Sequence, residues 1–423
     1  MEKKRYEALG ETLYTGTLEN GLTVYVIPKP DFEKKYASFA TGYGGADRRF
    51  QLDGAWRDTP AGIAHFLEHK LFDTETGNAL ADLAANGASP NAFTSAEMTA
   101  YHFECTAGFE ENLKTLLSFV SIPWFTAESV AKEQGIIGQE IDMIEDHPGH
   151  AVYYNLLKGL YGTHPVRDSI AGTVESIAQI SAETLYDLHR AFYRPSNMVL
   201  CAVGDVDPER VLEIAREALP KDYHAPPVKD YGSPDGIPVI NPKTEVKMEV
   251  SQPIFFAGTR VPPGTSGEAS LQKELTGHLA TQYLAGKSSP LYVRLYGEGL
   301  ISTDFACAFM NGRSYAITAF AGESRDPDRV LEEVKAELKN IQAQGIDEVR
   351  FTRLKKATSG QLIRKLDSIE TLCHEQTESH FHGASALDQP ALLTNITGAD
   401  VQAFIADHLK PEQFALSVVS PKL

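Results

Sequence analysis

The chain has little cysteine, no excess of positive charge and no long apolar run, and each absence excludes a class of protein. Its 423 residues include four widely spaced cysteines, which predicts neither a disulfide scaffold nor a zinc ribbon. A formal net charge of -18 opposes binding to nucleic acid or to an anionic membrane. No stretch approaches the roughly 18 apolar residues that span a membrane, and no apolar run follows the N-terminal MEKKRYEALG. We therefore expect a cytoplasmic protein with reduced thiols and no signal peptide.

The chain mixes strand and helix patterns, which predicts an α+β fold. At about 150 residues per domain, its length allows two to three domains. The stretch around 219–246 is rich in proline and glycine and has little periodicity, which is typical of a linker. We predict an N-terminal catalytic domain over 1–222, a linker over 223–247 and a C-terminal domain over 248–423.

The two halves resemble each other weakly. The segment FYRPSNMVLCAVG (192–204) aligns with HLKPEQFALSVVS (408–420) at an offset of 216, with Pro195 over Pro411. GFEENLKTLLSFV (108–120) aligns with RDPDRVLEEVKAEL at nearly the same offset. Two matches in the same order predict an internal duplication, in which the second domain lacks the histidine motif described next.

The segment GIAHFLEHKLF (62–72) carries two histidines four residues apart with a glutamate before the second. At about 100° per residue, His65, Glu68 and His69 share a stripe about 100° wide on one side of a helix. The opposite side is apolar. Histidines at i and i+4 can bind one Zn²⁺, and the glutamate would stand beside the metal, where it can take a proton from water. Surface histidines that pair by chance are the alternative.

A catalytic zinc needs three protein ligands, so a third must come from elsewhere. In KEQGIIGQEIDMIEDH, Glu133 and Glu140 lie seven residues apart and share a helix face, but only one could reach the same metal. Gly135 and Gly138 weaken this helix unless close packing requires them, and an approach to the helix of His65 would be such a reason. A solvated acidic face is the alternative.

The motif, the downstream glutamates and the segments GASPNAFTSAEMTAY, HPVRDSIAGTVESI and FYRPSNMVLCAVGDVD together resemble one family. It is that of the inverted-zincin peptidases of the pitrilysin and insulinase type, in the branch of the mitochondrial processing peptidases and their bacterial relatives. The resemblance implies that Glu140, 71 residues beyond His69, is the third ligand and that Glu133 supports the site. It implies one Zn²⁺ per chain, with Glu68 as general base.

The resemblance also implies a fold and a substrate. The fold would be half of a clam shell, made of two similar α/β domains, each a mostly antiparallel sheet covered by helices. The substrate would be a short or unfolded peptide, bound as an added edge strand and cleaved within its chain. Asn91, Ala92, Phe93 and Thr94 would supply that edge, although an ordinary strand end after a turn at Ser89 and Pro90 is the alternative.

The sequence departs from the family in its second half. Members that act alone commonly carry an Arg and a Tyr, seven residues apart, that contact the substrate. In SPLYVRLYGEGLIS, Leu295 and Ser302 stand at those places, while Arg294 and Tyr296 are out of register. An oxyanion forming at a zinc ion needs nearby donors. We therefore expect a homologous subunit to supply the pair in a heterodimer, with a homodimer as the alternative.

Two further hypotheses stay open. Cys373, His374, His380 and His382 in CHEQTESHFH could form a second metal site, although their spacing is irregular. The chain could also be a structural or assembly subunit without catalysis, because a fold does not determine a function. No Gly-x-Ser-x-Gly segment occurs, so a serine hydrolase is not supported.

Overall fold

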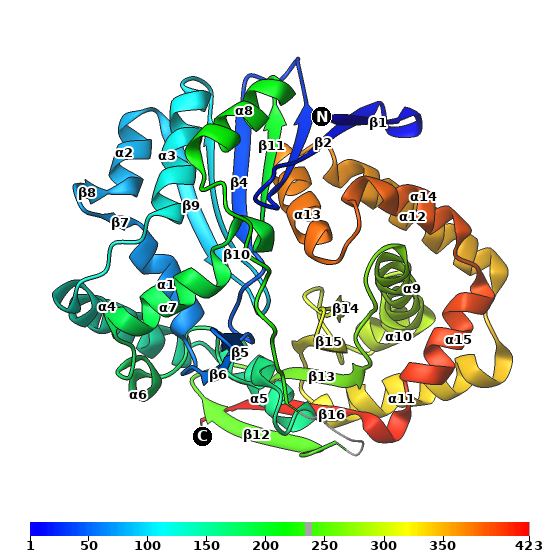
Figure 1. Ribbon diagram of the computed structural model, residues 1–423. Coiled ribbons are helices and arrows are strands. Elements are labelled where there is room, and N and C mark those ends of the chain that lie inside the picture. The colour runs from blue at the N-terminus through cyan, green and yellow to red at the C-terminus, as the bar shows by residue number, and fades with distance from the viewer. Residues whose placement is uncertain (233–238, 423) are drawn as a thin grey trace.

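The computed structural model describes residues 1–232 and 239–422, and it contains two mixed sheets covered by helices (Figure 1). The predicted α+β class is confirmed. Residues 233–238 of the predicted linker lie outside the described residues. None of the helices in the described ranges is long and apolar enough to cross a membrane.

The larger sheet has seven strands and the smaller has five. In spatial order the larger contains β1 (Glu2–Tyr6), β2 (Glu11–Thr17), β3 (Thr23–Pro28), β11 (Met198–Gly204), β4 (Lys35–Thr41), β10 (Thr99–Cys105) and β9 (Ala88–Thr94). The smaller contains β12 (Lys243–Met248), β16 (Ala415–Pro421), β13 (Ile254–Val261), β15 (Ala316–Glu323) and β14 (Ala306–Asn311). Two small hairpins pair β5 (Arg49–Leu52) with β6 (Ala55–Asp58) and β7 (Asp73–Thr74) with β8 (Gly77–Asn78).

The two sheets repeat one topology. The order β3-β11-β4-β10-β9 in the first sheet corresponds to β12-β16-β13-β15-β14 in the second. In each, the first pair is parallel and the other three pairs are antiparallel. The aligned segments also correspond, because β11 and β16 occupy the same place in their sheets. This shared topology supports the predicted duplication.

Fifteen α-helices lie in the described ranges. Those of the first half are α1 (Ile63–Leu71), α2 (Ala79–Ala85), α3 (Phe109–Ser121), α4 (Ala127–Glu145), α5 (Pro148–Leu160), α6 (Val174–Ile177), α7 (Ala182–Phe192) and α8 (Pro208–Ala218). Those of the second half are α9 (Glu268–Ala285), α10 (Pro290–Gly297), α11 (Pro327–Gln344), α12 (Glu348–Lys365), α13 (Ile369–Phe381), α14 (Gln389–Asn395) and α15 (Gly398–His408).

One helix from each half of the sequence covers the sheet formed by the other half. Helix α13 packs against β11 and β4 of the first sheet, and α5 packs against β16 and β13 of the second (Figure 1). Apolar side chains bury both contacts: Leu372 and Cys373 of α13 share a core with Ile27, and Leu156 of α5 shares one with Ile317. The predicted division into 1–222, 223–247 and 248–423 stays a prediction, because α13 belongs to the third range and covers the first sheet.

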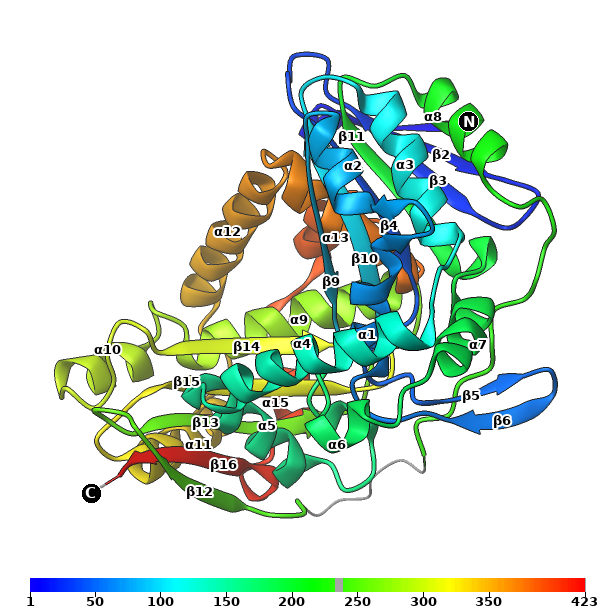
Figure 2. The same cartoon turned by 90° about the vertical axis from the view of Figure 1, so that its left-hand side faces the viewer.

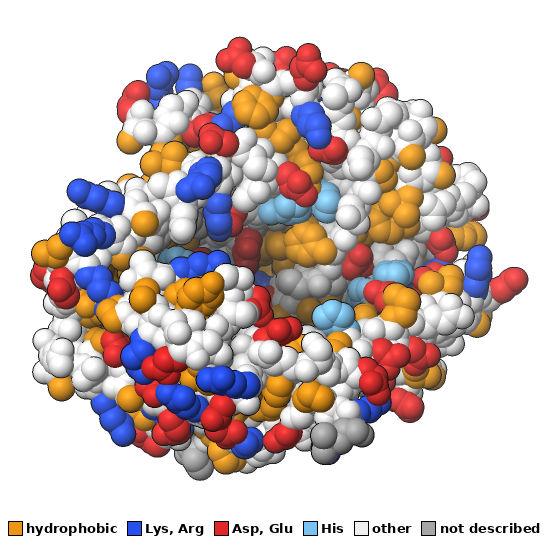
Figure 3. Space-filling view, turned by 180° about the vertical axis from the view of Figure 1, so that it is seen from behind, with side chains coloured by type: hydrophobic (Ala, Val, Ile, Leu, Met, Phe, Trp, Pro, Cys, Tyr) orange, Lys and Arg blue, Asp and Glu red, His pale blue; other side chains and the backbone are white. Residues whose placement is uncertain are grey.

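The opposite face of the first sheet carries helices α1, α2, α3 and α8. Helix α1 contacts the edge strand β9 and also the long helix α4 (Figure 2). The histidine motif therefore lies between a helix and the free edge of a sheet. The space-filling view shows a hollowed face with His, acidic and hydrophobic side chains gathered in it (Figure 3).

Candidate active site

The predicted helix over the histidine motif is α1. It begins after Gly62, whose φ of 91° is left-handed and whose added Cβ would lie 2.5 Å from the Ala171 carbonyl oxygen. Glycine is therefore required at this N-cap. The apolar side of the helix is buried in the first core, where Phe66 and Leu67 are fully enclosed. Burial of that side turns the motif's polar stripe toward α4.

Helix α4 carries the two predicted glutamates on one face. It begins with a capping box between Thr126 and Ser129 and buries Ile137 and Ile141. Our explanation of its two glycines is wrong: a Cβ on either Gly135 or Gly138 would meet nothing within 4 Å. The contact of α4 with α1 is made by larger side chains, so no close backbone approach requires these glycines.

His65, His69 and Glu140 form the only group of three metal-ligating side chains among the described residues, with ligand atoms within 4.8 Å of one another. His65 Nε2 lies 3.6 Å from Glu140 Oε1, and His69 Nε2 lies 3.7 Å from Oε2. Ligands about 2.0–2.1 Å from a tetrahedral ion are separated by roughly 3.4 Å. The donor set and its spacing therefore fit Zn²⁺.

Glu133 contacts the other nitrogen of His69. The Nδ1 atom of His69 lies 3.1 Å from Glu133 Oε1. A proton on Nδ1, donated to this carboxylate, leaves the lone pair of Nε2 directed toward the metal position. His65 Nδ1 is buried and has no hydrogen-bond partner among the described residues. Glu133 is thus placed to orient the His69 ring. The orientation of the His65 ring depends on the side chains packed around it.

Burial and neighbouring charges change the titration of the site. Burial and the nearby His69 lower the pKa of His65 to about 4, which keeps its imidazole neutral and able to bind a cation. Burial also lowers the pKa of His69, but the hydrogen bond to Glu133 and the Glu68 and Glu140 charges outweigh it and leave that pKa raised. Burial raises the pKa of Glu68. A raised carboxyl pKa suits a group that accepts and releases a proton.

Glu68 lies beside the three potential ligands without joining them. Its side chain is 7% exposed, and its Oε2 atom accepts a hydrogen bond of 2.5 Å from the Thr94 hydroxyl. Sequence reasoning placed Thr94 at the substrate edge and missed this contact. The spacing of the two residues carries no signal for it, because the contact depends on how β9 passes α1.

The predicted substrate residues lie on β9, which ends the sheet and pairs only with β10 among the described strands. The Ser95 N–H bonds to the Met98 carbonyl, and bonded pairs alternate along an antiparallel ladder. The main-chain N–H and C=O groups of Asn91 and Phe93 therefore point toward β10. Those of Ala92 and Thr94 point toward the free edge of the sheet. Asn91 Oδ1 already accepts from the Ala92 N–H.

Comparison with known proteins decides the family. Insulinase (Peptidase family M16) matches residues 53–174, and the Peptidase M16 inactive domain matches residues 179–358. The zinc protease YmfH of Bacillus subtilis is 39% identical over 423 residues, which cover 99% of this chain and 98% of YmfH. The chain belongs to the M16 (insulinase) family of peptidases. The predicted resemblance to the pitrilysin and insulinase type is confirmed.

Other M16 proteins extend the comparison. The zinc protease ML0855 of Mycobacterium leprae is 29% identical over 86% of this chain and 81% of its own length. An M16-like peptidase from Alicyclobacillus acidocaldarius has a TM-score of 0.93 and 34% identity, over 98% of this chain and 99% of that one. Pitrilysin has a TM-score of 0.76 at 16% identity, which shows the fold alone, and this chain covers 46% of it. The fold is thus like one half of pitrilysin.

The alternative of a second metal site at Cys373, His374, His380 and His382 is not supported among the described residues. The rings of His374 and His380 contact the hydroxyls of Tyr36 and Tyr25, with distances of 2.8 and 3.2 Å from His374 Nε2 and His380 Nδ1. His382 Nδ1 lies 3.3 Å from the Ser270 hydroxyl, and the Cys373 thiol donates to the Cys201 carbonyl. Each side chain faces a different neighbour along α13, so they do not converge on one point.

Leu295, at an expected position of the substrate-binding Arg and Tyr pair, and its neighbours make contacts within the second half. Leu295 on α10 is fully buried in the second core. Arg294 pairs with Glu333 of α11 at 2.8 Å, and Tyr296 is half exposed and stacks on Tyr292.

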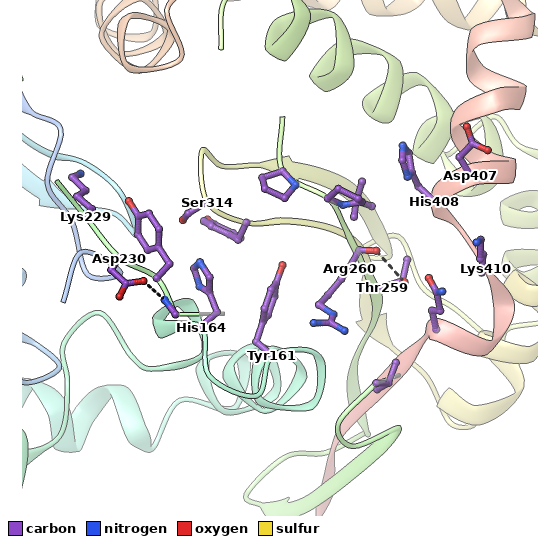
Figure 4. Close-up of a pocket in the computed structure, with 18 residues that line it drawn as sticks. Tyr161, His164, Lys229, Asp230, Thr259, Arg260, Ser314, Asp407, His408 and Lys410 are labelled. Carbon is purple, nitrogen blue, oxygen red and sulfur yellow. Dashed lines mark hydrogen bonds between the residues drawn. The ribbon is translucent and has the colours of Figure 1, made fainter. Parts of the chain in front are cut away.

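Two cavities of the molecule lie outside the candidate metal site. One of about 530 Å³ has Tyr161, Thr259, Ser314 and His408 in its walls (Figure 4). Another, of about 740 Å³, lies beside the start of α1 and has Arg48 in its wall. Neither is lined by the potential metal ligands. The candidate site instead lies beside the free edge of β9, which suits an extended chain more than a small enclosed ligand.

Proposed function

We propose that this protein is a zinc-dependent endopeptidase that cleaves short or unfolded peptides. The observation that carries the proposal is the convergence of His65, His69 and Glu140 beside the buried carboxylate of Glu68. The names of the relatives YmfH and ML0855, both zinc proteases, support it. A structural subunit would have no need of all four side chains in this arrangement.

In this proposal His65, His69 and Glu140 hold one zinc ion per chain, and Glu133 orients His69. A zinc ion held there would act as a Lewis acid and make water more acidic. Glu68 is the general base: Thr94 occupies its Oε2 atom, and Oε1 takes the proton of the attacking water. The same carboxyl group then delivers the proton to the leaving amine.

The substrate would add to β9 as a further strand. The main-chain groups of Thr94 and the Ala92 carbonyl point to the free edge, whereas the Ala92 N–H already donates to Asn91 Oδ1. Main-chain pairing gives affinity without a strict side-chain requirement. Asn91 and Phe93 would contribute through their side chains, which line the strand on the face toward α13; Phe93 stacks edge-on to His374 at 5.2 Å. The predicted edge of residues 91–94 thus divides into two main-chain and two side-chain positions.

Two measurements on the purified chain test this function: its zinc content and its cleavage of a fluorescence-quenched peptide. Wild-type protein should contain about one zinc per chain and cleave the peptide, and removal of zinc by a chelator should abolish cleavage reversibly. Glu68→Gln should retain the zinc and lose at least about a hundredfold in kcat, because the general base is gone. Glu145→Gln, at an exposed position on α4, is the matched control and should behave as wild type. Wild-type protein that binds no zinc would favour the structural-subunit alternative.

We further propose that a homologous subunit completes the site, either a different chain or a second copy. The expected Arg and Tyr are replaced by Leu295 and Ser302, and this chain covers 46% of pitrilysin. A separate subunit could supply the oxyanion donors that one half lacks. Affinity capture from the cell extract of the source organism would identify a partner, and activity should rise on adding it. A purified monomer with full activity on unfolded peptides would refute the two-subunit proposal.

A further inference from the structure

Thr94 links the proposed substrate edge directly to Glu68, the proposed general base. Its hydroxyl donates the 2.5 Å hydrogen bond to Glu68 Oε2, and no other side-chain hydrogen bond to Glu68 occurs among the described residues. Glu68 is buried, so the direction of its carboxylate depends on this bond and on packing. Hydrogen bonds to a charged acceptor are short and about twice as strong as neutral ones.

The main chain of the same residue belongs to the free edge of β9. Thr94 opposes Thr99 in the register, and this pair follows the bonded Ser95–Met98 pair. The N–H and C=O groups of Thr94 therefore point away from β10. A peptide strand that pairs here would be held by the main chain of the residue whose side chain holds Glu68.

The position of the Thr94 hydroxyl is itself restrained. Thr99 Oγ1 lies 3.4 Å from Thr94 Oγ1 and donates to the Tyr43 carbonyl at 2.9 Å. Thr99 and Tyr43 are completely buried. The following turn is held on one side by the Gly45 N–H, which bonds to the Ser95 carbonyl. Such support keeps a side chain within the small positional range that catalysis needs.

We propose that Thr94 is a positioning residue that sets the Glu68 carboxylate relative to a peptide paired with β9. The inference rests on the proposed peptidase function and deepens it, because it gives Thr94 a role in the chemical step in addition to the substrate edge. Its hydroxyl fixes Oε2 and leaves Oε1 for proton transfer. Misorientation of a general base slows the chemical step more than it weakens substrate binding.

The test compares Thr94→Val with Thr94→Ser. Valine keeps the β-branched shape and the main-chain groups but removes the hydroxyl, whereas serine retains the hydroxyl. For Thr94→Val we expect kcat to fall about ten- to a hundredfold, with KM within about twofold of wild type. For Thr94→Ser we expect kcat within about threefold of wild type. In the Glu68→Gln background, Thr94→Val should cause no further loss.

A second readout does not depend on catalysis. Zinc affinity, measured by competition with a chelator, should agree within about threefold among wild type, Thr94→Val and Thr94→Ser. The hydrogen bonds of the Thr94 hydroxyl go to Glu68 and Thr99 and to none of the three potential ligands among the described residues. Circular dichroism and a melting curve verify that the variants fold. If Thr94→Val does not fold, Thr94→Ala replaces it as the variant without a hydroxyl.

Several outcomes would overturn the inference. Among them are an unchanged kcat in Thr94→Val, an increase in KM alone, equal losses in the Val and Ser variants, a further loss in the Glu68→Gln background, and a loss of zinc affinity. Each outcome would mean that the Thr94 hydroxyl does not position Glu68. Any effect of the substitution would then come from substrate pairing at β9, from the metal site or from the stability of the fold. Failure of the proposed function is a separate result, because wild-type protein would then show no zinc-dependent cleavage at all.

Discussion

Glu97, on the turn between β9 and β10, accepts hydrogen bonds from the backbone N–H groups of Arg313 and Ser314, on the turn between β14 and β15. The two bonds measure 2.6 and 2.7 Å, and the Ser314 hydroxyl and Arg313 guanidinium also contact Glu97. The turns occupy the same place in the two sheets. The edge strand of the candidate site is thus attached directly to the second half of the molecule.

This contact predicts a pH-dependent contribution to stability. Burial raises the pKa of Glu97, but the Arg313 charge and the bonds from Ser314 and the backbone outweigh it and leave the pKa lowered. A lowered carboxyl pKa stabilises the fold above the ordinary glutamate value of about 4.3, and this stabilisation is lost as the pH falls through the folded value. Glu97→Gln should reduce the free energy of unfolding at pH 7 by about 1.5–3 kcal/mol.

Urea unfolding at several pH values measures this effect. The difference between wild type and Glu97→Gln should shrink as the pH is lowered below about 4, where the wild-type carboxylate also becomes protonated. Glu104→Gln is the control, because Glu104 on β10 forms only a half-exposed pair with Lys34 and should change stability little. A difference that does not depend on pH would contradict the electrostatic explanation.

Glu133 should control zinc affinity without binding the metal. Replacing it with glutamine removes the charged acceptor at His69 Nδ1, and loss of such a contact typically weakens metal binding about ten- to a hundredfold. Competition with a fluorescent chelator measures the affinity of Glu133→Gln, with Glu145→Gln as control on the same helix. An unchanged affinity would show that His69 needs no partner to hold its orientation.

Gly135 and Gly138 should be replaceable by alanine with a gain in stability. Both lie within α4 with open space at the Cβ position, and alanine is favoured over glycine in a helix by about 0.5–1 kcal/mol. Gly44→Ala should have the opposite effect, because its Cβ would lie 2.5 Å from the Glu97 backbone nitrogen. Urea unfolding tests both. A more stable Gly138→Ala protein that loses peptidase activity would indicate that a substrate or partner approaches α4 there.

Zinc stoichiometry tests the absence of a second metal site on α13. The double variant His380→Ala and His382→Ala should keep about one zinc per chain, because these rings contact Tyr25 and Ser270. His65→Ala should lose most of its zinc at the same free concentration, because one of three ligands is removed. Atomic absorption after dialysis gives both values. Zinc loss in the α13 variant would require a metal site that the described residues do not form.

The sequence by itself predicted the features that depend on local period. The four-residue spacing of His65 and His69 and the apolar residues between them determine a helix with one chemical face and one buried face. The seven-residue spacing of Glu133 and Glu140 places both on one side of α4 for the same reason. Repetition of aligned segments at one offset similarly predicted the shared topology of the two sheets. Gly135 and Gly138 show the limit of local reasoning, because a glycine in a helix does not reveal whether anything lies beside it.

Only the tertiary structure showed which helix face packs against which sheet. An apolar pattern specifies that a helix face must be buried, but it does not specify the sheet that buries it, so the exchange of α5 and α13 between the halves could not be predicted. Contacts between distant segments have the same origin: Thr94 reaches Glu68 across 26 residues, and Glu97 reaches Arg313 across 216. The amino-acid sequence therefore determined which side chains of α1 and α4 form the candidate metal site. The direction of the Glu68 carboxylate and the attachment of the β9–β10 turn to the second half were decided by packing between elements that no local pattern relates.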